Sequence, residues 1–535
     1  MGTGQRSHPV TSGTESAGAE PAPRGAAARV GAGILVSRIF GFVRERFFAH
    51  YFGSSDFADA WRAGLRLPNV VQNLLGEGTL SASLIPVYAD LLEQGKDDEA
   101  GRFAGAMLGL LATVAAAVAL VGMALAPALV GLFFARWDPA KQELTVAVVR
   151  ILFPMTGVLV LSAWALGILN SHRRFFVSYV APVFWNLAMI ASMVGGAAYL
   201  GSDAPSRDLV VALAWGGLVG GVLQFGWQLP FVARHLRGMR LSLGRNVTGV
   251  REAVRNFWPV VAARGVVNLS AWIDLILAGQ LRAGAVAVLG YAQTFYVLPI
   301  SLFSMSIAAS ELPELSRMRG EAEHVVATRV AQALRRIMYF MVPSTLGYVV
   351  LGDVIIAALY ETGAFDASAS LVTWTVLGAY ALGLPASGSS RVLTSAFYAL
   401  RDSRTPSRIA YVRVAASVAV GVLLMIPLDR AGVGSLRLGA VGLALGASVG
   451  AWIEYVLLRR ALGARIGPHG PGGAASERIW LAGAVATGVG VALQLVLAPA
   501  HPALVALETL VPFGVVYVAG AALLGERFAW RRSAG

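Results

Sequence analysis

Residues 103–135 read FAGAMLGLLATVAAAVALVGMALAPALVGLFFA and contain no charged side chain over 33 positions. About 20 apolar residues in a helix are enough to cross the hydrocarbon core of a bilayer, so this stretch predicts a membrane span. The whole chain has the same character: 56% of its 535 residues are hydrophobic and 14% are charged. Soluble domains carry about 25% charged residues. The composition predicts an all-α protein that crosses a membrane many times, and it argues against a soluble enzyme, a disordered regulator or a coiled coil.

The apolar stretches divide into about fourteen candidate spans of roughly 20 residues each. They cover residues 30–52, 60–90, 103–135, 144–169, 176–200, 208–232, 253–280, 284–310, 331–360, 370–399, 407–428, 438–458, 479–498 and 503–524. A glycine and a Leu-Pro pair recur at an offset of 231 residues, as Gly53 with Leu67-Pro68 and as Gly284 with Leu298-Pro299. Two related bundles with a site between them are a common plan of transporters. We expect a disordered cytoplasmic tail at 1–28, an N-terminal six-helix bundle at 29–235, a C-terminal bundle at 236–460, and two additional helices with a cytoplasmic C-terminus at 461–535.

The basic residues are distributed unevenly between the expected loops. The chain has 43 Lys and Arg against 30 Asp and Glu, which gives a net charge of +13. If the N-terminus is cytoplasmic, 28 of the basic residues fall in inside segments and six in outside segments. The positive-inside rule gives this asymmetry for an even number of spans with both termini in the cytoplasm. Most of the basic charge is thereby assigned to topology, which leaves little case for binding nucleic acid.

The second expected span carries a row of polar side chains at spacings of three or four. These residues are Asp59, Arg62, Arg66, Asn69, Asn73, Glu77 and Ser81. At about 100° per residue they share one face of a helix, and from Asp59 to Glu77 the row is ~27 Å long. A charged row of this length has to face a water-filled cavity or be paired with other helices. We also expect Pro68 to interrupt this helix, as proline does in helix interiors.

The first expected span supplies the opposite wall of such a cavity. Arg38 and Glu45 are seven residues apart and so share a face, and Arg44 lies beside it. One interpretation is a cationic cavity for an anionic substrate, because the planar guanidinium binds phosphate oxygens in pairs and stays charged. The alternative is a buried network in which these arginines neutralise Glu45, Asp59 and Glu77.

The C-terminal half adds a smaller set of charged candidates: Arg264 and Asp274 near 253–280, and Arg391 near 370–399. Arg264 and Asn268 share a helix face, whereas Asp274 lies about 80° from Arg264 around the helix axis. Pairing with an arginine is the safer role for Asp274, and a coupling cation is a weaker one. No other metal ligand is expected.

Catalytic signatures are missing from this sequence. It has no cysteine, no phosphate-binding GxxxxGK[ST] and no HExxH, and its seven histidines are scattered. The stretch Gly446-Ala447-Ser448-Val449-Gly450 fits G-x-S-x-G but lies in an apolar span, where small residues allow close helix packing. We therefore expect a transporter without catalytic activity and without a cofactor.

Several dispersed motifs are similar to those of the MurJ/MviN lipid II flippase family of the MOP exporter superfamily. They are Ser37-Arg38-Ile39-Phe40-Gly41-Phe42-Val43-Arg44-Glu45, Asp59, Leu67-Pro68-Asn69, Gly76-Glu77-Gly78 with Pro86, Ile168-Leu169-Asn170, Ala181-Pro182 with Asn186, Leu312-Pro313-Glu314-Leu315-Ser316, and Phe397-Tyr398-Ala399-Leu400-Arg401-Asp402-Ser403-Arg404-Thr405-Pro406. The last is the most specific, and the resemblance covers about residues 30–460.

The resemblance implies two bundles in a V around a central cationic cavity in the bacterial inner membrane. The implied substrate is lipid II, an undecaprenyl-diphosphate-linked disaccharide-pentapeptide, moved to the outer leaflet by alternating access. Arg38 and Arg44 match the arginines expected to meet the diphosphate, with Asp59, Asn69 and Glu77 near them. The last two helices would form a groove for the lipid tail. Membrane lipids and cell-wall synthesis proteins are the implied partners.

The chain departs from the family pattern at several positions. Gln72 stands where the family often has a third cavity arginine, and Gln293 and Thr294 replace an acid–arginine pair. Arg66, Arg264 or Arg391 are candidates to compensate. Ser417 and Gly421 occupy the positions expected to help an Asp like Asp274 bind sodium, which puts sodium coupling in doubt. Switching could instead follow the membrane potential, which acts with about 2.3 kcal/mol per charge per 100 mV.

Three other kinds of function are compatible with parts of the sequence. A related exporter could carry another polyprenyl-linked glycan or a cationic drug, but a drug-cation exporter should line its cavity with acids, and the first two spans hold more arginines than acids. A membrane enzyme acting on lipid-linked sugars would need a sizeable loop with acids or histidines. A scaffold protein would not need a charged row through the bilayer.

Overall fold

The computed structural model describes residues 24–244, 247–281, 283–318, 322–431, 437–496 and 501–526. All regular secondary structure in these ranges is helical. The elements are α1 (Arg24–Phe52), α2 (Asp56–Leu75), α3 (Glu77–Ser83), α4 (Ile85–Glu93), α5 (Asp97–Phe133), α6 (Pro139–Ser171), α7 (Phe175–Leu200), α8 (Arg207–Ala233), α9 (Val250–Gly279), α10 (Ala285–Pro299), the π-helical turn η1 (Ile300–Ser304), α11 (Met305–Arg317), α12 (Glu323–Val350), α13 (Gly352–Tyr360), α14 (Ala367–Ala381), α15 (Leu384–Ala399), α16 (Arg404–Ala431), α17 (Gly439–Ile466), α18 (Gly473–Val496) and α19 (Pro502–Leu523).

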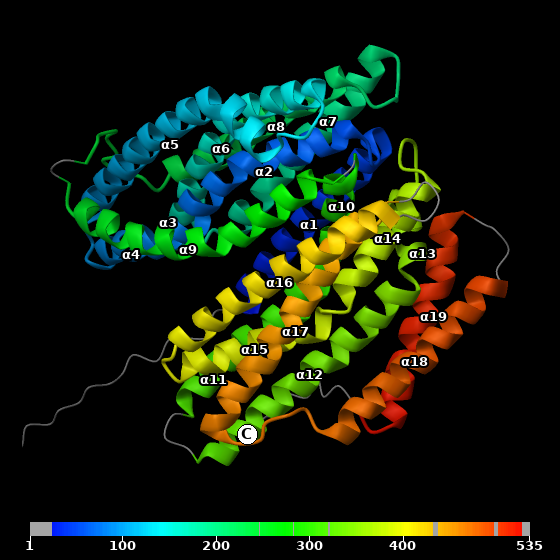
Figure 1. Ribbon diagram of the computed structural model, residues 1–535. Helices are drawn as coiled ribbons and strands as arrows, with labels where there is room; N and C mark the ends of the chain where they lie inside the picture. The colour runs from blue at the N-terminus through cyan, green and yellow to red at the C-terminus, as the bar shows by residue number, and fades with distance from the viewer. Residues whose placement is uncertain are drawn as a thin grey trace, which may run out of the picture.

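Two groups of helices make up the molecule (Figure 1). Helices α2 to α9 lie in the first group and α10 to α19 in the second, while α1 packs on α7 and also reaches α13. Helix α9 contacts α2 and α3 of the first group, and α10, α16 and α17 of the second. Helices α18 and α19 pack on each other and on α12 and α13. The expected domain boundaries stay a prediction. Of the expected tail at 1–28, residues 1–23 lie outside the described ranges and the remainder belongs to α1.

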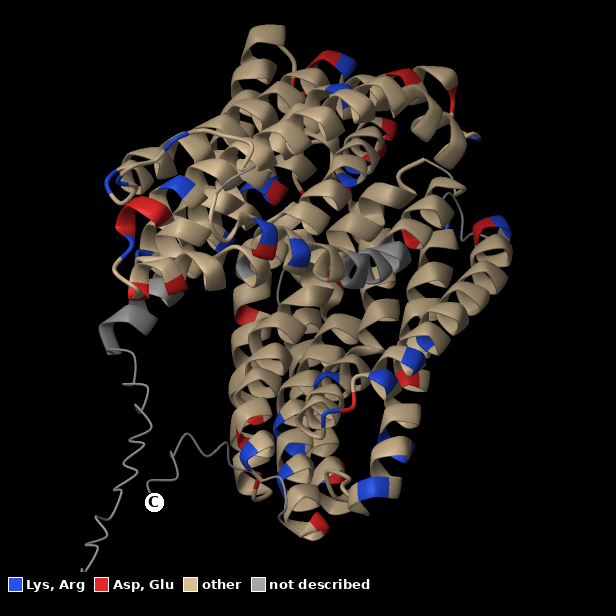
Figure 2. Cartoon of the chain, turned by 90° about the vertical axis from the view of Figure 1, so that its left-hand side faces the viewer, with Lys and Arg blue, Asp and Glu red and all other residues tan. Residues whose placement is uncertain are grey.

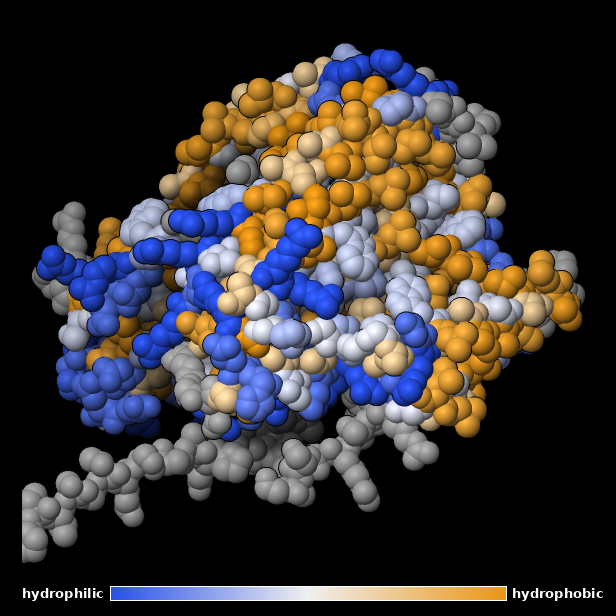
Figure 3. Space-filling model, turned by 60° about the horizontal axis from the view of Figure 1, so that its bottom comes forward, coloured by the Kyte–Doolittle hydropathy of each residue, from blue (hydrophilic) through white to orange (hydrophobic). Residues whose placement is uncertain are grey.

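The surface and charge distribution fit a membrane protein. In Figure 2, charged residues gather toward the ends of helices and between the two groups, and long stretches are uncharged. Figure 3 shows a hydrophilic end of the molecule next to apolar flanks. Within the described residues, nine helices are long and apolar enough to span a membrane, or up to eleven if each of two bent pairs is one span. Three further expected spans, 30–52, 60–90 and 253–280, coincide with α1, α2–α4 and α9, which are not among these eleven. The number fourteen therefore stays a prediction.

The second expected span is not one helix. Ser55 caps α2 by accepting a hydrogen bond from the Ala58 amide, and α2 then ends where Gly76 takes an extended conformation. The chain continues as the short helices α3 and α4. The prediction of one helical row from Asp59 to Ser81 is therefore wrong beyond Asn73. Pro68 lies inside α2 without ending it, so the predicted interruption is also wrong.

The most family-specific motif, at 397–406, has a structural role in the turn between α15 and α16. Asp402 accepts hydrogen bonds from the Arg404 and Thr405 amides and from the Thr405 hydroxyl, and it pairs with Arg465 at the end of α17. These donors, with the Thr405 hydroxyl first, lower the pKa of Asp402 to about 2. The carboxylate thus caps α16 and fastens it to α17.

Asp402→Ala is expected to lower the free energy of unfolding by about 1 kcal/mol, because an N-cap side chain contributes about that much. Denaturation in mixed micelles measures the change. Ser403→Ala, one position further on the exposed turn, is the control and should be neutral. Equal stability of the two variants would contradict the capping role.

Candidate functional site

A cavity of about 390 Å³ lies between the two helix groups. Helices α1, α2, α9 and α10 supply most of its lining, and α14 and α17 add one side chain each. Its polar side chains include three arginines, one acid and several neutral groups: Arg38, Arg62, Arg66, Asp274, Asn69 and Gln293. The remaining wall is largely apolar, so the cavity joins cationic groups to a surface that suits hydrocarbon.

Arg38 and Arg66 are the exposed cations of this cavity. The Arg38 Nη1 donates to the Ser301 hydroxyl at 3.0 Å, which links α1 to η1. Arg66 and Asp274 line the same cavity with opposite charges. Among the described residues, no carboxylate forms an ion pair with Arg38 or Arg66. Both guanidinium groups thus remain able to bind an anion.

Glu45 is the centre of a buried charge network beside the cavity. It is 8% exposed, and its two carboxylate oxygens each accept from an arginine at 2.6 Å, one from Arg44 and the other from Arg62. Arg44 also donates to the Asn186 side chain on α7 at 3.0 Å. Arg62 lies over the rings of Phe48 and Tyr291. For these residues the structure matches the alternative of a neutralising network, and Arg44 is not part of the cavity lining.

Glu45→Gln is expected to lower the free energy of unfolding by about 2 kcal/mol. The substitution leaves two arginines partly buried without their shared countercharge, and hydrogen bonds to charged groups contribute about 1.5–3 kcal/mol. Glu454→Gln is the matched control, since the ion pair of Glu454 with Arg413 is longer, at 3.2 Å, and more exposed. Its loss should stay below about 1 kcal/mol. A similar loss for both variants would contradict the network's special role.

Asp59 lies outside the cavity, at a junction between α2 and α10. It is 1% exposed and accepts hydrogen bonds from the Gly284 amide at 2.7 Å and the Ala287 amide at 2.8 Å. Lys141 of α6 pairs with it at 2.7 Å. An acid on the first amides of a helix is stabilised by the helix dipole. Asp59 therefore joins the two groups instead of lining the central cavity. We call Asp59, Lys141, Gly284 and Ala287 the α2–α10 junction.

Further contacts between the groups lie beside this junction. Arg46 donates to the carbonyls of Ala358 and Leu359 at 3.0 and 2.9 Å, where α13 ends without intrahelical donors. The Ala364 amide donates to the carbonyl of His50 at 2.8 Å. Gly284 has a φ of +85°, and a Cβ there would lie 2.3 Å from the Ser54 carbonyl oxygen. The two groups of helices are thus in close backbone contact at the end where the α2–α10 junction lies.

The other predicted site residues are placed less centrally. Arg391 is exposed on α15 and does not line the cavity, whereas Asn69 does. The side chains of Glu77 and Arg264 lie outside the described residues. In the described ranges, no group of three or more His, Asp or Glu could hold a metal ion. Thr294, at one of the positions that depart from the family pattern, lines the cavity and donates to the Gly290 carbonyl.

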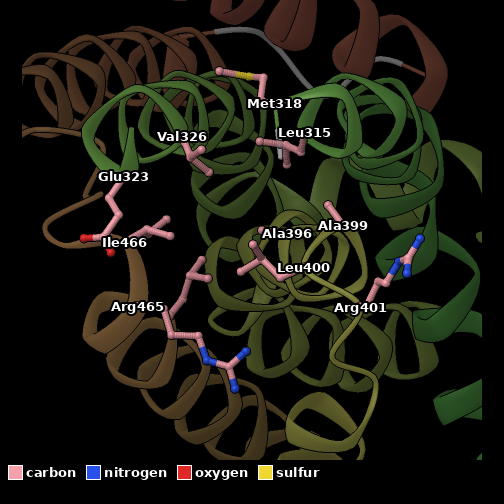
Figure 4. A pocket seen from close by; sticks show the side chains of 11 residues that line it. Leu315, Met318, Glu323, Val326, Ala396, Ala399, Leu400, Arg401, Arg465 and Ile466 are labelled. Carbon is pink, nitrogen blue, oxygen red and sulfur yellow. The ribbon is translucent and has the colours of Figure 1, made fainter. Parts of the chain in front are cut away.

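A second cavity of about 390 Å³ lies within the second helix group, at the ends of α11, α12, α15 and α17 (Figure 4). Leucine, alanine, valine and methionine side chains form most of its wall, with Arg401, Arg465 and Glu323 at the polar positions. It does not reach the first group. The central cavity is the better candidate because both groups meet there and because two of its arginines, Arg38 and Arg66, form no ion pair with a described carboxylate.

Sequence reasoning missed Lys141, Arg46 and Ser301. Lys141 is one of two lysines in the chain and falls between two expected spans, yet it is 8% exposed. Arg46 lies in the first expected span and caps another helix, α13. Its position on the first expected span, two residues beyond Arg44, was the available signal.

The chain was compared with known proteins. The family model described as "Lipid II flippase MurJ" matches residues 48–508, most of the chain. This chain belongs to the MurJ family. A probable lipid II flippase MurJ of Rhizobium meliloti is 31% identical over 437 residues, covering 81% of this chain and 79% of the relative. The lipid II flippase MurJ of Burkholderia cenocepacia is 31% identical, covering 79% and 80%.

Solved structures support the same fold for this MurJ family member. A lipid II flippase MurJ in an inward closed conformation has a TM-score of 0.74 at 21% identity, and the match covers 92% of this chain and 98% of that one. An inward-facing MATE family multidrug transporter of the MOP superfamily has a TM-score of 0.63 at 16% identity, covering 82% and 98%. The expected MOP-like helical fold is confirmed.

Proposed function

We propose that this chain moves lipid II from the inner to the outer leaflet of the bacterial cytoplasmic membrane by alternating access. Membership of the MurJ family supports the substrate, and one feature of the cavity supports the mechanism. Arg38 and Arg66 line the cavity between the helix groups, and no described carboxylate forms an ion pair with either of them. A diphosphate is the group that two such arginines would bind well, and the apolar wall suits the adjoining lipid. Asn69 would add a neutral donor.

The contacts between the groups suggest how the cavity could open to alternate sides. The α2–α10 junction and the Arg46 contacts hold the groups together at the end that contains Lys141, near the start of α6, which the charge asymmetry assigns to the outside. Release of the substrate outward would require these contacts to separate. We place both termini in the cytoplasm, because the segments on that side carry more basic residues than the segments on the outside.

The proposed reaction is movement without bond-making. The described cavity residues are arginines, amides, one aspartate and apolar side chains, which suit binding of a charged headgroup. Arg44, Glu45 and Arg62 would keep α1 and α2 in register beside the cavity. The implied partners are lipid II, the surrounding membrane lipids and the proteins of cell-wall synthesis.

The test is made in cells depleted of their own flippase and supplied with this chain. Labelled lipid II is followed by an impermeant probe at the outer leaflet. Exposure that depends on the chain would support the function. A correctly inserted chain that gives no exposure would contradict it and would favour a related exporter of another polyprenyl-linked glycan.

A further inference from the structure

A third cavity, of about 500 Å³, lies at the end of α17, away from the transport path. Nine residues line it: Tyr455, Val456, Arg459, Arg460, Gly463, Gly467, Pro468, His469 and Gly470. The set includes two arginines and no Asp or Glu. Both arginines are exposed, and within the described part of the chain neither of them forms an ion pair. Two positive charges therefore share one hollow without a protein anion.

The loop after α17 is shaped around this hollow. His469 is 3% exposed, and its Nδ1 donates to the Gly467 carbonyl at 2.8 Å, which fixes the turn that closes the cavity. The Arg459 guanidinium lies against Gly470, where a Cβ would be 2.5 Å from its Nη2 atom. It also approaches the Tyr455 hydroxyl, at 3.4 Å from Nη1. The Arg459 head group is thus held beside the loop instead of extending freely.

An apolar lane on the same helix leads to the arginines. Val449, Trp452 and Val456 follow at spacings of three and four and are 38%, 41% and 39% exposed. Arg459 and Arg460 continue that spacing, so the lane and the cations share one face. An exposed apolar face on a membrane-spanning helix contacts acyl chains, and Trp and Tyr are common where chains meet headgroups.

We propose that this cavity binds the phosphate headgroup of an anionic phospholipid, with an acyl chain along Val449, Trp452 and Val456. The arginines supply the donors, because guanidinium groups bind phosphate oxygens in pairs. Basic pockets beside membrane helices recognise anionic lipid headgroups in this way. The site is separate from the central cavity, and it concerns a lipid that stays with the protein instead of one that is moved.

Native mass spectrometry of the intact chain, titrated with phosphatidylglycerol, tests the site. The double variant Arg459→Gln/Arg460→Gln should bind this lipid about thirtyfold more weakly, since a basic residue near an anionic surface contributes about 1 kcal/mol. The matched control is Arg404→Gln/Arg408→Gln, which removes two exposed arginines from the neighbouring end of α16. It should change binding less than twofold. Equal losses in the two doubles would mean general electrostatic attraction and would overturn the proposal.

A variant that keeps the charge separates geometry from electrostatics. Gly470→Ala leaves both arginines in place but displaces the Arg459 head group, and the flexible side chain can move aside without unfolding the loop. We expect about fivefold weaker binding of phosphatidylglycerol, since one of two arginine contacts is lost. Unchanged binding would overturn the geometry. Binding of phosphatidylcholine as tight as that of phosphatidylglycerol would overturn the anionic lipid, and displacement of the lipid by equimolar inorganic phosphate would overturn the acyl lane.

Discussion

Asp59→Asn is expected to lower the free energy of unfolding by about 3 kcal/mol. The carboxylate is almost fully buried and accepts from Lys141 and from two backbone amides of α10. Asparagine has a similar shape, but the N–H groups of its side-chain amide would face the donors of Lys141, Gly284 and Ala287. Lys141 would keep only Asp56, which is 57% exposed, as a charged partner. Removal of one partner from a buried ion pair costs about 3–5 kcal/mol. Denaturation in mixed micelles measures the loss.

A double-mutant cycle shows whether the pair acts as a unit. Lys141→Met should cost less, about 2 kcal/mol, because the amides at the start of α10 still stabilise the Asp59 carboxylate. The double variant should recover about 2 kcal/mol relative to the sum of the single losses, as expected for residues in direct contact. Strictly additive losses would contradict the α2–α10 junction.

Asp59→Asn should also move the two helix groups apart at the end where the α2–α10 junction lies. The chain has no cysteine, so one introduced thiol reports its own accessibility. Ser54 lines a cavity of about 240 Å³ beside Gly284. A thiol introduced by Ser54→Cys should react several times faster with a water-soluble maleimide in the purified chain when Asp59 is replaced. A thiol introduced by Ser403→Cys, on the exposed turn before α16, should react equally in both backgrounds. Unchanged labelling of Ser54→Cys would show that the junction does not hold this end closed.

The sequence predicted the kind of protein well, because the length of apolar runs is a property of many residues at once. The orientation taken from loop charge stays a prediction. It also predicted that Arg66 and Asn69 line one cavity, since residues three or four apart lie on one helix face, and that Arg38 of the first span lies on the opposite wall. It could not predict which charges pair with which. Asp59 belongs to the same polar row, yet its partners Gly284 and Ala287 lie more than 220 residues away in the chain. Periodicity describes a face of one helix and says nothing about the helix opposite.

The break after Leu75 shows a second limit. The polar row from Asp59 to Ser81 keeps helical spacing, but the backbone at Gly76 leaves the helix, so the spacing continues by coincidence across two elements. Arg44 shows a third. Its motif implied contact with the diphosphate, whereas Glu45 and Asn186 hold its guanidinium outside the cavity lining. A motif gives the residue but leaves open the rotamer that decides its role.

Arg38→Gln and Arg66→Gln are each expected to reduce lipid II exposure at the outer leaflet by about tenfold to a hundredfold. A charge-assisted hydrogen bond to phosphate contributes about 1.5–3 kcal/mol, and about 1.4 kcal/mol corresponds to a factor of ten. Both side chains are exposed in the cavity, so stability should change by less than about 0.5 kcal/mol. Arg150→Gln is the control: Arg150 is an exposed arginine on α6, outside the cavity lining, whose Nε donates to the Met123 carbonyl at 3.4 Å.

Arg44→Gln should give the opposite pattern, because its guanidinium is held by Glu45 and Asn186 beside the cavity. We expect a loss of stability of about 2 kcal/mol, as for a hydrogen bond to a charged group, and a fall in lipid II exposure no larger than the fall in folded protein. Normalising exposure to the amount of folded chain separates the two roles. If Arg44→Gln abolished exposure at full stability while Arg38→Gln and Arg66→Gln left it unchanged, the diphosphate would bind on the α7 side of α1, and the central cavity would not be the substrate site.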